Sequence, residues 1–145
     1  MPTIEYVTVA NHAEAINGLL YLHGAGWTDM SLSAPSDGPL SVVHLGIGLS
    51  VLVGWNETNR RFPLSVVIAH EDGGDPVIQV EGQIEQGRPA GLTPGQDLRS
   101  VLAINAEIQF PGPGGYEVRA KLQDQIRSVS FRVHALPALG SPAST

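Results

Sequence analysis

The chain has 145 residues, no cysteine and a net charge of −6. The length fits one domain, and the absence of cysteine excludes disulfides, thiolate-ligated zinc and a cysteine nucleophile. Because the eight basic residues are scattered, apart from the pair Arg60 and Arg61, we expect the protein to bind neither nucleic acid nor an anionic membrane surface.

Eight segments with alternating apolar and polar residues predict β-strands. In chain order they cover residues 4–10, 18–23, 41–55, 62–71, 77–86, 98–110, 116–123 and 127–135. The connection at 11–17 is predicted to be either a tight turn or a single helical turn that Asn11 could cap. Clusters of Gly, Pro and Asp separate most later strands, and the short link at Asp124 and Gln125 predicts a final hairpin.

This pattern, without a long helix or a repeat, predicts an all-β fold: an antiparallel two-sheet sandwich of about eight strands, immunoglobulin-like or jelly-roll. We place the single domain at residues 1–136 and a flexible tail at 137–145, which has small and polar residues and two prolines.

The strand at 41–55 has one apolar face. Its other face is bare at Gly46 and Gly48, which would let another sheet or subunit approach closely.

The five histidines are the first candidates for a functional site, at positions 12, 23, 44, 70 and 134. Neither a His-x-His pair nor a His-Glu-x-x-His run occurs, so we expect no metal and no cofactor. The favoured interpretation is ordinary hydrogen-bonded histidines; the alternative is that distant strands bring His23, His44 and His70 together. His12 and Glu14 would share a face only if their segment is extended.

The segment at 19–30 is the second candidate, because a strand there runs into two glycines and then Trp27. Glycines at a strand end permit a bulge or a close backbone approach, and tryptophan adds a large amphipathic surface. A core tryptophan that closes one end of the sandwich is the favoured interpretation, and a ligand or partner contact is the alternative. No Gly-x-Ser-x-Gly elbow for a serine nucleophile is present.

Several motifs together resemble a family of small, uncharacterised proteins common in actinobacteria. They are Ala10-Asn11-His12-Ala13-Glu14, the run from Asn17 to Trp27, Phe62-Pro63-Leu64, Glu71-Asp72-Gly73, Gly87-Arg88-Pro89 and Pro113-Gly114-Gly115-Tyr116. The resemblance covers most of the chain up to Val133. It implies a bacterial β-sandwich protein, and it implies no activity and no catalytic residues.

Three functions are compatible with the sequence. The first is a non-catalytic protein-interaction or assembly module, which self-associates into a homo-oligomer and uses the face at Gly46 and Gly48. The second is a small-molecule-binding protein or enzyme with a pocket that brings together at least two of the residues His23, Trp27, His44, His70 and Arg88. The third is a metal-dependent version of the second. We rank them in this order and expect no catalytic residue.

The N-terminus lacks a basic start followed by an apolar segment, and the apolar stretch at 40–55 is too short and mixed to span a bilayer, so we expect a cytoplasmic protein.

Overall fold

The computed structural model describes residues 2–34 and 39–136, which form nine β-strands. They are β1 (Thr3–Ile16), β2 (Leu19–Ala25), β3 (Asp29–Ser33), β4 (Val43–Val53), β5 (Arg61–His70), β6 (Ile78–Glu85), β7 (Leu98–Ile108), β8 (Gly114–Leu122) and β9 (Gln125–Leu136). One 3-10 turn, Trp55–Glu57, follows β4. Across these two ranges, no helix has the length and apolar character needed to cross a membrane.

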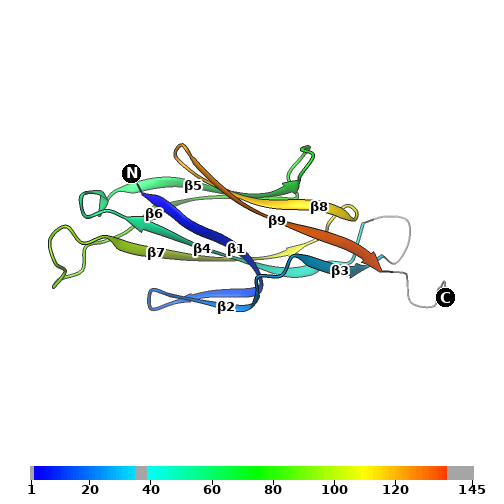
Figure 1. Ribbon diagram of the computed structural model, residues 1–145, viewed down its shortest axis with the longest axis horizontal. Coiled ribbons are helices and arrows are strands. Elements are labelled where there is room, and N and C mark those ends of the chain that lie inside the picture. The colour runs from blue at the N-terminus through cyan, green and yellow to red at the C-terminus, as the bar shows by residue number, and fades with distance from the viewer. Residues whose placement is uncertain (1, 35–38, 137–145) are drawn as a thin grey trace.

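The strands form two sheets that face each other, which confirms the predicted all-β sandwich. The first sheet has the order β2-β1-β4-β7 and the second has the order β3-β9-β8-β5-β6. Neighbouring strands are antiparallel, except that β3 runs parallel to β9. Figure 1 shows the two layers with β5, β8 and β9 on one side and β4 and β7 on the other. The predicted tail at 137–145 lies outside the described residues.

The core lies between the sheets because each strand directs every second side chain inward. On β4 these are the buried residues Leu45, Ile47, Leu49, Val51 and Val53. Aromatic rings close the core at one end. The ring of Phe110 lies edge-on to that of Tyr116, with the ring centroids 4.7 Å apart, and Phe131 packs against both.

The strand pairing matches the immunoglobulin-type sandwich and not the jelly roll. In the usual lettering, β1, β4 and β7 correspond to strands A, B and E, while β6, β5, β8 and β9 correspond to C′, C, F and G. Tyr116, near the start of β8, donates its hydroxyl hydrogen to the carbonyl oxygen of Gly112 at 2.7 Å. A tyrosine in this place, bonded to the backbone a few residues upstream, is typical of immunoglobulin-like folds.

The chain before β4 differs most from the prediction. The connection predicted at 11–17 is not a helical turn, because β1 continues as a strand to Ile16. The turn is formed by Asn17 and Gly18, whose φ angles are 52° and 76°. Asn-Gly with positive φ at both positions is the strongest short hairpin signal. The prediction also lacks the short strand β3, whose five residues alternate between polar and apolar but form too short a run to stand out.

Candidate functional site

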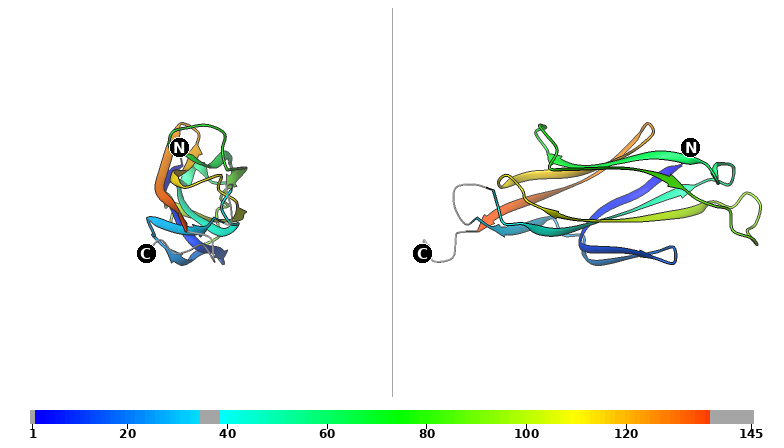
Figure 2. Two further views of the ribbon diagram at one scale, coloured as in Figure 1. Left: turned by 90° about the vertical axis from the view of Figure 1, so that its right-hand side faces the viewer. Right: turned by 180° about the vertical axis from the view of Figure 1, so that it is seen from behind.

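The hairpin formed by residues 11–25 lies across the outer face of the first sheet. β1 pairs with β4 only as far as Ala10, which lies opposite Gly46, and the rest of β1 pairs with β2. Asn105 on β7 binds β1 at Ala13, where β1 crosses the face of the sheet; we call this point the crossing. The side-chain oxygen of Asn105 accepts from the Ala13 amide at 3.0 Å, and its side-chain nitrogen donates to the Ala13 carbonyl at 2.7 Å. Figures 1 and 2 show this hairpin as an extra layer beneath β4 and β7.

The glycine-lined face of β4 therefore has an occupant from the same chain. A Cβ placed on Gly46 would lie 2.7 Å from the backbone nitrogen of Ala13. A Cβ on Gly48 would lie 2.7 Å from Leu22 Cδ2 and 3.0 Å from Leu20 Cδ2. The sequence correctly indicated a close approach, but it assigned that approach to a partner. The hairpin covers Gly46 and Gly48 and leaves no room there for the predicted partner contact.

Beside this crossing, four side chains from three strands form a hydrogen-bonded line, which we call the histidine row: Glu14, His12, His44 and Glu107. His12 Nε2 lies 3.2 Å from Glu14 Oε1, and His12 Nδ1 lies 2.9 Å from His44 Nε2. His44 Nδ1 lies 2.6 Å from Glu107 Oε1. The ring centroid of His23, on β2, lies 5.9 Å from that of His12. The side chains of His12 and His44 remain 39% and 40% exposed, so the row is open to solvent.

A hollow of about 320 Å³ lies next to the row, between β3 and the start of β4. Its lining brings together two residues singled out from the sequence, Trp27 and His44. Asn11 and Asp29 add polar groups to the same wall. Small-molecule sites commonly combine an apolar lining with a few converging polar groups. Met30, Leu32 and Val43 supply that apolar part here.

Asp29 and Trp27, which both line the hollow, make contacts that fix their positions. The hydrogen bond from His134 Nε2 to Asp29 Oδ1, at 2.7 Å, and a second from Thr28 lower the pKa of Asp29 below its usual value. Trp27 packs edge-on against Phe131, with ring centroids 5.4 Å apart, and is partly buried against the core. Its Nε1 is buried and has no hydrogen-bond partner among the described residues.

The other two predicted site residues lie elsewhere. His70 packs edge-on against Tyr116 at 5.2 Å, and its Nδ1 accepts from the backbone amide of Asp72. Arg88 lies over the ring of Trp55 at 3.8 Å and donates to the Trp55 carbonyl and to the Thr58 hydroxyl. These contacts attach each side chain to its own neighbourhood, and neither His70 nor Arg88 lines the hollow at Trp27. His70 lies apart from His44, so the structure does not show the alternative in which His23, His44 and His70 come together.

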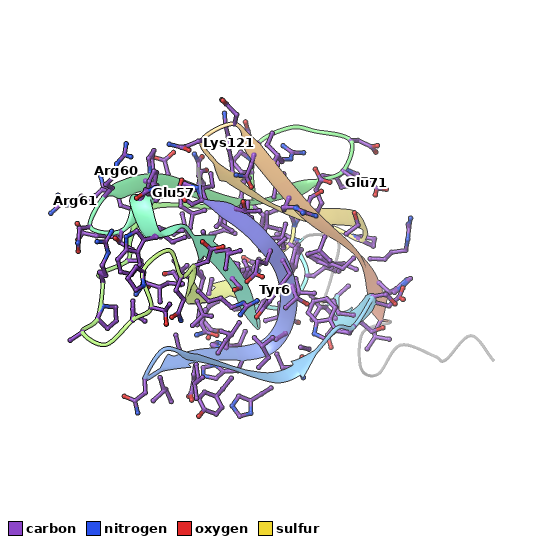
Figure 3. All side chains as sticks on the ribbon, turned by 60° about the vertical axis from the view of Figure 1, so that its left-hand side comes forward. Tyr6, Glu57, Arg60, Arg61, Glu71 and Lys121 are labelled. Carbon is purple, nitrogen blue, oxygen red and sulfur yellow. The ribbon has the colours of Figure 1, made fainter. Side chains whose placement is uncertain are left out.

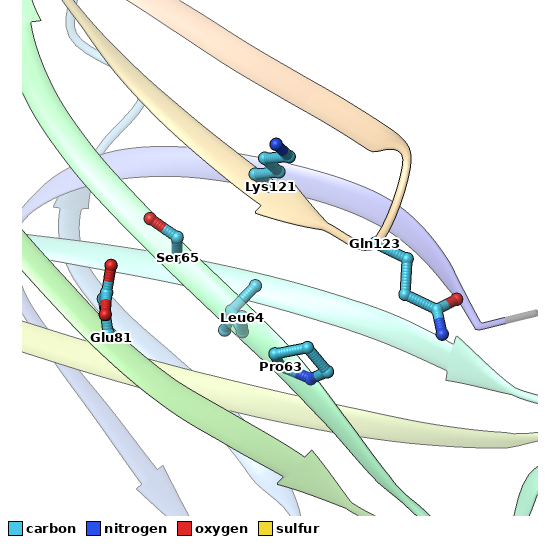
Figure 4. A pocket seen from close by; sticks show the side chains of 6 residues that line it. All are labelled: Pro63, Leu64, Ser65, Glu81, Lys121 and Gln123. Carbon is cyan, nitrogen blue, oxygen red and sulfur yellow. The ribbon is translucent and has the colours of Figure 1, made fainter.

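Further surface features surround the two ends of the sandwich. Figure 3 shows Arg60 and Arg61 beside Glu57 at one end and Glu71 toward the opposite end. The basic pair thus lies next to the 3-10 turn that Arg88 covers. A second hollow, of about 240 Å³, lies on the second sheet, and Figure 4 shows the side chains that line it. Pro63, Leu64, Ser65, Glu81, Lys121 and Gln123 line it.

Sequence reasoning missed Asn105 and Glu107. Their alternation on β7 placed both on the polar face, but nothing local indicated that β1 would cross that face. In the part of the chain that the structure describes, no group of three or more His, Cys, Asp or Glu side chains is arranged to hold a metal ion.

Comparison with known proteins places the chain in a family. A model of DUF6941, a family of unknown function, matches residues 5–134, and the chain belongs to this family. The match spans the sandwich almost from β1 to the end of β9. Membership of an uncharacterised family is thereby confirmed, whereas an actinobacterial origin stays a prediction. No curated protein matches the chain.

Proposed function

We propose that this member of the family is a non-catalytic protein-interaction module that self-associates through strand β2. The single observation that carries this proposal is a strip of exposed apolar side chains on the hairpin. Ile16, Leu19 and Tyr21 are 47%, 59% and 46% exposed. They account for three of the seven large apolar residues that are exposed in the described chain.

The register of the hairpin places this strip on one face. Ile16 lies directly opposite Leu19, and Glu14 lies opposite Tyr21. Residues directly opposite each other in an antiparallel pair point to the same side. Leu20 and Leu22 point the other way, onto Gly48. The hairpin therefore covers the sheet with one face and presents Ile16, Leu19 and Tyr21 on the other.

The position of β2 favours a second copy as the partner. β2 is the end strand of its sheet, so its outer backbone edge has no pairing strand within the described chain. Such an edge can accept another strand, and the same patch on two copies gives a closed two-fold dimer. This placement replaces the predicted contact at Gly46 and Gly48. It keeps the predicted function and moves the surface to the opposite side of the hairpin.

The test is the mass of the particle in solution. We expect a dimer by light scattering at about 100 µM protein, a concentration that saturates a dimer with a micromolar Kd. The double substitution Leu19→Lys and Tyr21→Lys should give a folded monomer. The matched control combines Ile126→Lys and Leu136→Lys, which change two apolar residues of β9 with similar exposure. A wild-type monomer, or a dimer that survives the change in β2, would contradict the proposal.

A small-molecule-binding protein is the second candidate, because Trp27 and His44 meet in one hollow. The indole N–H of Trp27 gives a separate NMR signal and can report a ligand beside it. We expect fragments that combine an aromatic ring with an amine to shift the signals of Trp27 and His44, because Asp29 supplies a carboxylate there. Trp55 and His70 are the internal controls. Equal shifts at both tryptophans, or none, would exclude a specific site.

The proposed cellular location is the cytoplasm. The absence of cysteine is compatible with a reducing compartment. Cell fractionation with an antibody against the native chain tests this directly, and recovery in an extracellular fraction would contradict it.

A further inference from the structure

The histidine row has a fixed number of protons, which follows from what each group can donate. Ionised carboxylates only accept hydrogen bonds. Glu14 therefore requires a hydrogen on His12 Nε2, and Glu107 requires one on His44 Nδ1. The remaining two ring nitrogens, His12 Nδ1 and His44 Nε2, face each other at 2.9 Å.

Two neutral rings cannot satisfy this arrangement. A neutral imidazole has one N–H, and in both rings the carboxylates already use it. The two facing nitrogens would then both present lone pairs across a distance of hydrogen-bond length. Two fully protonated rings fail as well, because both facing nitrogens would be donors. The contact at 2.9 Å requires one hydrogen between the rings, hence three N–H groups on four nitrogens.

We propose that His12 and His44 form an imidazole–imidazolium pair, which shares one proton between the two rings and holds the hairpin at 11–25 against β4. Loss of the shared proton sets two lone pairs against each other, and gain of another sets two imidazolium ions against each other. The fastening therefore holds within a window of pH and weakens on both sides of it.

The surroundings of the pair favour this state. Glu14 on β1 and Glu107 on β7 place two carboxylates against the shared positive charge. Other titratable groups nearby are His23 and Tyr21 on β2, of which Tyr21 lies opposite Glu14, and Asp29 on β3, which lines the hollow with His44. Asp29 is already paired with His134, and this leaves the two glutamates as the direct partners of the row.

The location of the pair connects the proton to the hairpin. His12 lies where β1 has left its pairing with β4, just before the crossing at Ala13. Asn105 and the leucines Leu20 and Leu22 are the neighbouring attachments. Opening of the row would loosen the crossing while the sandwich stays folded. A link to self-association would rest on the proposed function, whereas the proton count does not.

NMR on the full chain at low concentration tests the proton count and the fastening together. Ring ¹⁵N shifts distinguish N–H from bare nitrogen at each histidine. We expect three N–H groups on His12 and His44 at neutral pH, with an NOE between the Leu22 methyl groups and Gly48. The NOE should be lost on both sides of the window. Four half-occupied nitrogens typical of free imidazoles, or an NOE unchanged from pH 5 to 9, would overturn the proposal.

The substitution Glu107→Gln gives a sharper test. An amide can donate as well as accept, so the side-chain amide of this variant can donate to His44 Nδ1 and free His44 Nε2 to donate to His12. The row is then satisfied by two neutral rings. We expect the NOE to survive on the alkaline side in this variant and to be lost there in the wild type. His70→Gln, away from the row, is the control and should leave both limits unchanged. Alkaline loss in both proteins would overturn the proposal, and a change in dimer mass would not affect it.

Discussion

Gly46 lies directly beneath the backbone of Ala13, so that a Cβ at position 46 would be 2.7 Å from the Ala13 nitrogen and 2.8 Å from the His12 carbonyl carbon. Gly48, two residues on, meets only the ends of the Leu20 and Leu22 side chains. Both glycines make room for the same hairpin, but one faces backbone and the other faces side chains that can move.

This difference predicts unequal costs for two alanine substitutions. Gly46→Ala should lower the free energy of unfolding by about 1–3 kcal/mol, the usual range for overpacking, because the crossing strand has to shift. Gly48→Ala should cost less than about 1 kcal/mol, because the leucines can change rotamer. Urea unfolding followed by circular dichroism measures both. Equal costs would mean that the hairpin does not rest on β4 as described.

Asn105 is expected to hold the crossing in place. Asn105→Ala leaves the buried N–H and C=O of Ala13 without their partners, and each unpaired buried group costs about 1–3 kcal/mol. We expect lower stability and faster amide exchange at Ala13. Asn56→Ala, at an exposed position of the 3-10 turn, is the control. Unchanged exchange at Ala13 would contradict the assigned role.

Tyr116→Phe should show the contribution of the tyrosine corner. The substitution removes the hydroxyl that donates to Gly112 and keeps the ring in the aromatic core. A loss of about 0.5–1.5 kcal/mol in the free energy of unfolding is expected, the net value of one hydrogen bond. Tyr6→Phe, at an exposed tyrosine outside the proposed dimer surface, serves as the control and should change the free energy little. A similar loss in both variants would exclude a special role for Tyr116.

The same tyrosine should make stability depend on alkaline pH. Burial raises the pKa of Tyr116 above its ordinary value of 10.0. The neutral form is therefore favoured by the folded state, so this contribution is complete below pH 10 and is lost as the pH rises through the folded-state pKa. Unfolding measured above pH 10 should show a steeper decline for the wild type than for Tyr116→Phe. Parallel declines would assign the effect to other groups.

Glu5 should make stability depend on acid pH in the opposite direction. Hydrogen bonds from Arg99 and from Ser50 lower the pKa of Glu5 below its ordinary value of 4.5. Its contribution is present above pH 4.5 and is lost as the pH falls through the lower, folded-state pKa. Glu5→Gln should flatten this part of the stability curve. Glu81→Gln, on an exposed strand, is the control and should leave the curve unchanged.

Features of the fold that depend on neighbouring residues in the chain could be predicted, whereas features that depend on distant residues could not. Strands β4 to β9 were predicted from alternation, because the direction of each side chain depends only on its neighbours in the strand. The hairpin at 11–25 was missed even though Asn17 and Gly18 carry a local turn signal. The two glycines of β4 were correctly interpreted as a place of close approach, but a bare strand face does not say whether the occupant belongs to the same chain.

The candidate site was likewise predictable only in part. His12, Glu14, His23, Trp27 and His44 could be named from the sequence as candidates, yet their arrangement could not. His12 and His44 are 32 positions apart, and His44 and Glu107 are 63 positions apart. Which of these side chains meet depends on how far β1 follows β4 before it crosses the sheet. The sequence by itself determined the sandwich, because strand alternation and turns are local. Only the tertiary structure decided the histidine row and the exposed strip on the hairpin, because both arise where the chain folds back over its own sheet.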